Sequence, residues 1–132
     1  MAAITKSATV NMDAVSGMKP STISGKLAGE AIAKGHACYL KGADGKIYKS
    51  IGTAANEAAK VHGFAADAAA INEAVTLYGA GAIWEYGTAL TPGVDVFLGL
   101  VAGELDTVAQ LGHPLPVGHV VDAQRIRITV YS

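Results

Sequence analysis

One stretch of the sequence occurs twice, and this duplication limits the folds that the chain can adopt. ALTPGVDVFL at residues 89–98 repeats the pattern of AIAKGHACYL at residues 31–40, an offset of 58 residues. Eight positions are identical or similar at this offset: Ala31, Ile32, Gly35, Cys38, Tyr39, Leu40, Gly45 and Ile47 match Ala89, Leu90, Gly93, Val96, Phe97, Leu98, Gly103 and Leu105. GFAADA at residues 63–68 also resembles GHVVDA at 118–123, and VTLY at 75–78 resembles ITVY at 128–131. The chain therefore contains two related units.

Each unit has the pattern of short β-strands separated by glycine turns. HACYLKGADGKIYKS predicts a hairpin that turns at residues 42–45, and RIRITVYS alternates apolar with polar residues, as a strand with one buried face does. Further strands are expected near 61–66, 74–78 and 82–86, with a turn at Asn72 and Glu73, and residues 52–61 form either a short helix or a loop. A repeat that occurs only twice does not make a solenoid.

These strands predict a mainly β fold. We expect a small β-sandwich or barrel-like domain, similar to a β-tulip, built from two related β-units, with at most one short helix. Pairing the two units would let each cover the apolar face of the other.

Residues 1–27 are expected to form an extended N-terminal arm, and residues 28–132 the β-domain. The arm has no sustained periodicity, yet it is more apolar than a solvated tail requires. We predict that it docks onto a neighbouring subunit or a larger partner, and the alternative is a disordered terminus. The apolar residues of the arm are Ile4, Val10, Met12, Val15, Met18 and Ile23.

Composition argues against several partners. The 132 residues suit one domain, and a net charge of -1 with 16% charged residues provides no basic surface for nucleic acid. No apolar run is long enough to span a membrane, and the first residues lack the layout of a signal peptide. The single cysteine, Cys38, excludes an intramolecular disulfide, fits a reducing compartment and is expected in a buried strand.

The sequence contains no catalytic or cofactor motif. The four histidines lack metal-ligand spacing, and no phosphate-binding glycine loop or nucleophile elbow is present. Asp67 and Asp122 occupy matching places in the two units, where turn capping is a better explanation than acid–base catalysis. Trp84 suits a core position or an exposed interface anchor equally well. We therefore predict no catalytic residue, cofactor, metal or small-molecule substrate.

Four segments of the chain resemble one family. AGEAIAKGHACYLKGADGKIYKS, GFAADAAAINEAVTLYGAGAI, YGTALTPGVDVFLG and VGHVVDAQRIRITV are similar to the capsid decoration, or cement, proteins of tailed bacteriophages, and related phrases occur in head-fibre and tail proteins. The resemblance implies a non-enzymatic virion protein, made in the host cytoplasm and often trimeric, that binds the outer face of the phage head and stabilises it. It also implies that the arm contacts the major capsid protein.

Two other classes of function stay open. A head-fibre or tail-associated module that binds carbohydrate or a receptor would use exposed aromatic side chains, with Trp84, Tyr86 and Tyr48 as candidates. A small hydrolase is the enzyme alternative, and it has little support from the residues.

Overall fold

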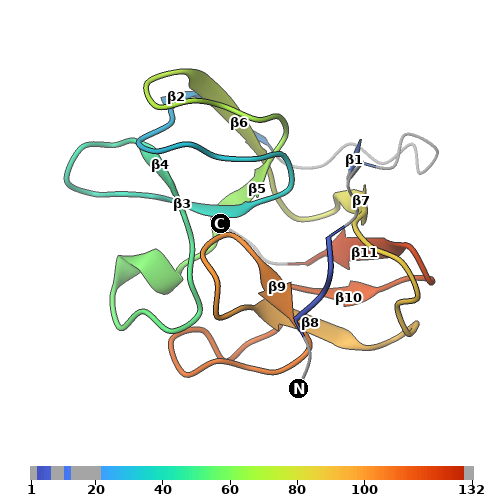
Figure 1. The fold of residues 1–132 in the computed structure, drawn as a ribbon. Coiled ribbons are helices and arrows are strands. Elements are labelled where there is room, and N and C mark those ends of the chain that lie inside the picture. The colour runs from blue at the N-terminus through green and yellow to red at the C-terminus, as the bar shows by residue number, and fades with distance from the viewer. Residues whose placement is uncertain (1–2, 7–10, 13–21, 130–132) are drawn as a thin grey trace.

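The strands form two antiparallel sheets (Figure 1). The computed structural model describes residues 3–6, 11–12 and 22–129. The first sheet has the order β2-β6-β5-β3-β4, with β2 (Thr22–Leu27), β3 (Ala37–Leu40), β4 (Ile47–Lys49), β5 (Gly63–Ala65) and β6 (Ala74–Tyr78). The second has the order β1-β7-β11-β10-β8-β9, with β1 (Asn11–Met12), β7 (Ile83–Glu85), β8 (Asp95–Leu98), β9 (Leu105–Asp106), β10 (Gly118–Val120) and β11 (Arg125–Ile128).

The predicted mainly β fold is confirmed. Within the described residues the helical element is η2 (Glu57–Ala59), a single 3-10 turn in the segment expected to be a short helix or loop. No helix in this part of the chain is long and apolar enough to cross a membrane.

The duplication is visible in the pairing of the strands. Apart from β1, the second sheet repeats the order of the first, strand for strand. The register repeats as well, because Cys38 lies opposite Gly63 just as Val96 lies opposite Gly118. The hydrogen bond from Gly35 N to Ala65 O, 2.8 Å long, has its counterpart of the same length from Gly93 N to Val120 O. The two sheets are therefore copies of one folding unit.

The last strand of each unit shows where sequence similarity misleads. Leu77 of β6 lies opposite Ala65, and Ile126 of β11 lies opposite Val120. The structural offset between these strands is thus 49 residues, whereas the resemblance of VTLY to ITVY implies 53. A shift of four residues preserves which face of a strand is apolar, so residue pattern alone could not detect it.

The glycines recur at the same spacing in the two units because the backbone requires glycine at these turns. Gly35 and Gly93 both have a φ of 84°, and Gly45 and Gly103 have φ values of 69° and 82°. These left-handed conformations suit glycine because other residues meet a steric penalty there. Each pair of glycines therefore turns the chain at the same points of the two units.

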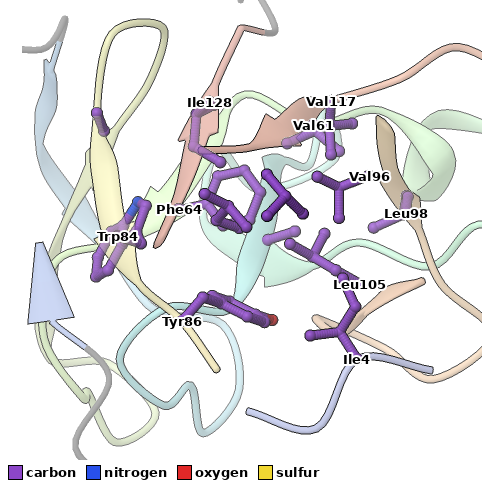
Figure 2. Close-up of a cluster of buried hydrophobic side chains, with 14 residues drawn as sticks. Ile4, Val61, Phe64, Trp84, Tyr86, Val96, Leu98, Leu105, Val117 and Ile128 are labelled. Carbon is purple, nitrogen blue, oxygen red and sulfur yellow. The ribbon is translucent and has the colours of Figure 1, made fainter. Parts of the chain in front are cut away.

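The two units have separate cores. The core of the first unit holds only its own residues, namely Ala28, Ile32, Cys38, Ile47, Ala65, Ala69, Val75 and Leu77. The core of the second unit also takes Ala37, Val61 and Phe64 from the first, and Phe64 lies near its centre (Figure 2). The sequence suggested that each unit covers the apolar face of the other, but the covering is not reciprocal. Instead, one face of the first sheet packs onto the core of the second unit.

The described residues of the expected arm pair with both sheets: Ala3 and β1 pair with the second sheet, and residues 22–27 form β2 of the first. Ile4, expected to contact the capsid, is only 6% exposed and lies in the core of the second unit, because it fills space beside Leu105. Met12 lies in β1 opposite Trp84 of β7, and Ile23 of β2 packs against the core of the first unit. The expected arm residues Val10, Val15 and Met18 lie outside the described residues.

Replacing Phe64 by alanine tests the shared core. We expect a loss of about 3–5 kcal/mol in the free energy of unfolding, because a fully buried ring is removed from between the two units. His119 occupies the equivalent place in β10 and is partly exposed, so His119→Ala should change the free energy by less than about 0.5 kcal/mol. Urea unfolding of both variants measures the difference, and equal losses would contradict the assigned packing.

Candidate functional site

Exposed apolar side chains gather on two neighbouring loops of the second unit. Among the described residues, eight large apolar side chains are exposed, and five of them lie between residues 100 and 115. We call these five the apolar loop surface: Leu100 (47% exposed), Val101 (62%), Val108 (39%), Leu111 (100%) and Leu115 (69%). Large apolar side chains are more often buried, so five exposed ones within 16 residues make these loops the candidate binding region.

Hydrogen bonds to the first unit hold these loops in place. Gly52 donates its N–H to Gly99 O at 2.8 Å and accepts the N–H of Gly112 at 2.9 Å, so it joins both loops. A β-carbon on Gly112 would lie 2.1 Å from Ala54 O, and only glycine allows this close approach. The apolar tips are therefore presented on a backbone that is anchored at its base.

Two side-chain contacts add to the anchoring of the loop that follows β9 and contains Val108, Leu111 and Leu115. Asp106 is buried, and its Oδ1 accepts the N–H of Val108 at 3.1 Å. His113 Nδ1 lies 3.1 Å from Leu115 O, which requires the ring to donate a proton from that nitrogen. An anchored loop loses little conformational entropy when it binds, so this surface suits a docking role.

The equivalent loops of the first unit differ in chemistry. The turn at residues 41–46, which matches residues 99–104, is KGADGK, and the structure exposes no large apolar side chain there. Asp44 instead accepts hydrogen bonds from Lys46 N and from the hydroxyl of Tyr48. The same fold thus tolerates a polar turn, so folding does not require the apolar side chains of the second unit.

A polar cluster lies in a hollow of about 410 Å³ beside the apolar loop surface. His36 Nε2 lies 3.1 Å from Glu104 Oε2, and Lys6 Nζ lies 3.5 Å from the same oxygen. The N–H of Ala33 donates to His36 Nδ1 at 3.1 Å, so the neutral ring carries its proton on Nε2 and donates it to Glu104. Burial, together with the charge of Lys6, lowers the pKa of His36.

This histidine is arranged for packing rather than for catalysis. The lone pair of Nδ1 is occupied by a backbone N–H, and Nε2 already donates to a carboxylate. A general base needs a free lone pair within reach of a substrate proton. His36 offers none in this arrangement.

The other candidates for chemistry are also tied into the fold. His62 Nδ1 accepts the N–H of Leu40 at 3.0 Å, and burial raises the pKa of the Cys38 thiol to about 12, which keeps the sulfur protonated. The prediction that Cys38 is a buried strand residue is confirmed. The described residues include no group of three His, Cys, Asp or Glu side chains placed to hold a metal ion.

The two aspartates at matching positions have different surroundings. Asp122 accepts the N–H groups of Gln124 and Arg125 at 2.9 and 3.0 Å, which confirms the predicted turn capping. These hydrogen bonds hold the pKa of Asp122 below its ordinary value. Asp67 is exposed, and its Oδ1 lies 3.8 Å from Nζ of Lys34.

Trp84 is a core residue, which settles the choice between core and interface anchor. It is fully buried in β7, and its ring centroid lies 6.2 Å from that of Tyr78. Its indole N–H has no hydrogen-bond partner among the residues that the structure describes. Tyr86 is also fully buried (Figure 2). Two of the three aromatic candidates for carbohydrate binding are therefore inaccessible, and of the three only Tyr48 is partly exposed.

Acidification is expected to destabilise the fold through two partly buried histidines, His36 and His62. Burial lowers the pKa of both His36 and His62 from the ordinary 6.5, so the unfolded chain binds these protons more readily than the folded chain. The free energy of unfolding should be constant above about pH 7.5 and should fall as the pH drops through about 6.5 towards 5. Urea unfolding at several pH values measures this slope.

The control is the double variant His36→Asn, His62→Asn. The asparagine oxygens can accept the same backbone N–H groups, but the side chains do not titrate. Its slope between about pH 7.5 and 5 should be smaller than that of the wild type. An unchanged slope would show that other groups are responsible.

A scan against models of known protein families and a search of curated proteins found no match to this chain. The similarity to phage decoration proteins therefore rests on the four sequence segments quoted above. The geometry adds anchored loops with exposed apolar side chains on one unit. It also shows that His36 and His62, which are partly buried, accept backbone hydrogen bonds and that the Cys38 thiol is buried.

Proposed function

We propose that this protein is a virion structural protein, a decoration or cement protein that binds the outer surface of a phage head and stabilises it. Its partner is the major capsid protein, and it acts as a homotrimer on the virion surface. The observation that carries the proposal is the apolar loop surface, which the second unit has and the first unit lacks. The resemblance of the four sequence segments indicates which partner this surface meets.

Such a role needs binding alone. A protein that binds the assembled shell better than free subunits stabilises the shell by mass action. Several copies around a symmetry axis add avidity, so each contact can be weak. Leu111 and Leu115 suit this role because their side chains are open to a partner while hydrogen bonds at Gly112 and His113 hold their loop.

Co-sedimentation with expanded, undecorated phage heads tests the proposal. The wild-type protein should sediment with the heads at micromolar concentration and raise the temperature at which the shell disrupts. Leu111→Asp and Leu115→Asp should each weaken binding by about tenfold or more, because each places a charge in an apolar contact.

Ile71→Asp is the matched control. Ile71 is 60% exposed in the first unit, so its replacement makes the same kind of change outside the apolar loop surface, and binding should persist. Absence of wild-type protein from the pelleted heads would overturn the proposal. Equal weakening by all three variants would overturn the assignment to this surface. Light scattering of the free protein tests the trimer.

The arm also provides a test. Residues 13–21 contain Val15 and Met18, and we propose that this segment contacts the major capsid protein. Replacing these nine residues with a Gly-Ser linker of equal length should weaken head binding while the free energy of unfolding stays nearly constant. This design is sharper than removing the whole arm, because Ile4 and β1 belong to the folded domain. Undiminished binding would show that the segment makes no capsid contact.

A further inference from the structure

Residues 3–6 occupy a groove at the open edge of the second unit. Ile4 donates its N–H to Leu105 O at 3.2 Å, and Ala3 forms an antiparallel bridge with Asp106 of β9. The side chain of Ile4 lies next to Leu105 at the border of the core cluster (Figure 2). Residues 3–6 therefore extend the edge of the sheet at β9 through one β-bridge and one backbone hydrogen bond.

The first unit fills the same place with its own continuous chain. Ile47 is the counterpart of Leu105, and its carbonyl accepts the N–H of Gly29 at 2.8 Å. Gly29 follows β2 by two residues, so the first sheet closes on the chain that leaves its own first strand. In the second unit the equivalent carbonyl receives Ile4, which lies far from β7 in the sequence.

The two cores differ in the side chains that occupy equivalent positions. Core positions held by Ala65 and Ile23 in the first unit hold Val120 and Trp84 in the second. Among the described residues, only the core of the second unit includes a side chain from residues 3–6. Ile4 fills the opening at this edge.

The groove has a shape that selects its occupant. A β-carbon on Gly87 would lie 3.0 Å from Thr5 O and 3.7 Å from Ile4 Cγ2, so the segment lies directly against this glycine. Two hollows of about 410 Å³ each adjoin the segment, and Ala3 lines both of them. Lys6 pairs with Glu104 at one end. The groove therefore fits a short extended peptide that has one branched aliphatic side chain and, two residues later, a basic side chain.

We propose that this groove is a peptide-binding site that accepts residues 3–6 of a second copy of the chain as well as its own. The observed occupant is held by strand pairing and one buried side chain, which are the contacts used in strand addition between proteins. Exchange of an identical element replaces every contact with its equal, so it costs little at equilibrium. The proposal does not depend on capsid binding.

A pair of complementary variants tests the exchange. The acceptor lacks residues 1–8, which leaves its groove vacant. The donor carries Gly87→Val, whose side chain would displace Thr5 and release the donor's own segment. A tagged acceptor should capture the donor in a 1:1 ratio, and a donor that also carries Ile4→Asp should bind at least about tenfold more weakly. Equal capture with and without Ile4→Asp would overturn the proposal.

A second experiment covers an acceptor that fails to fold. A protease site placed at residues 7–10 of the full chain is cut after folding, and a labelled peptide with the sequence MAAITKSA is added. The peptide should replace the cut segment and bind saturably, and its Ile4→Asp form should not bind. Failure of the peptide to bind the cut protein, or equal binding of both peptides, would overturn the proposal.

Discussion

The closure of each sheet at one backbone carbonyl determines how this protein is assembled. Ile47 O in the first unit and Leu105 O in the second need a donor, because a buried carbonyl without a hydrogen bond is costly. In the first unit the donor is the N–H of Gly29, which lies in the chain that follows β2. In the second unit the donor is the N–H of Ile4, which lies in the N-terminal segment. The first unit is therefore closed by its own chain, whereas the second requires a segment from outside the repeat.

This difference divides the two copies into a supporting unit and a presenting unit. The first unit has small core residues and polar turns, and it donates Phe64 to the core of its partner unit. The second unit has larger core residues, apolar loop tips and the groove for Ile4. The apolar loop surface and the groove for Ile4 both lie on the second unit. The first unit serves as an internal reference that shows what folding alone requires.

Much of the fold was predictable because local chemistry specifies it. The hairpin of β3 and β4, the glycine turns and strand β6 match the sequence patterns, and the alternation in RIRI gives β11 one buried face. The register of β11 was not predictable, since two alignments four residues apart bury the same face. The candidate site was also missed, because the apolar residues of the 99–115 loops look like ordinary core residues until the structure shows their exposure.

The sequence by itself determined that the chain is duplicated, that its units are made of short strands, and where those strands turn, because glycine positions and alternating patterns act within a few residues. Only the tertiary structure decided that Trp84 is buried, that Leu111 is exposed and that Ile4 closes the second sheet. These outcomes depend on which distant segment fills a given space. An apolar residue gives the same local sequence pattern whether its side chain is buried in a core, completes the edge of a sheet or is exposed for binding to a partner.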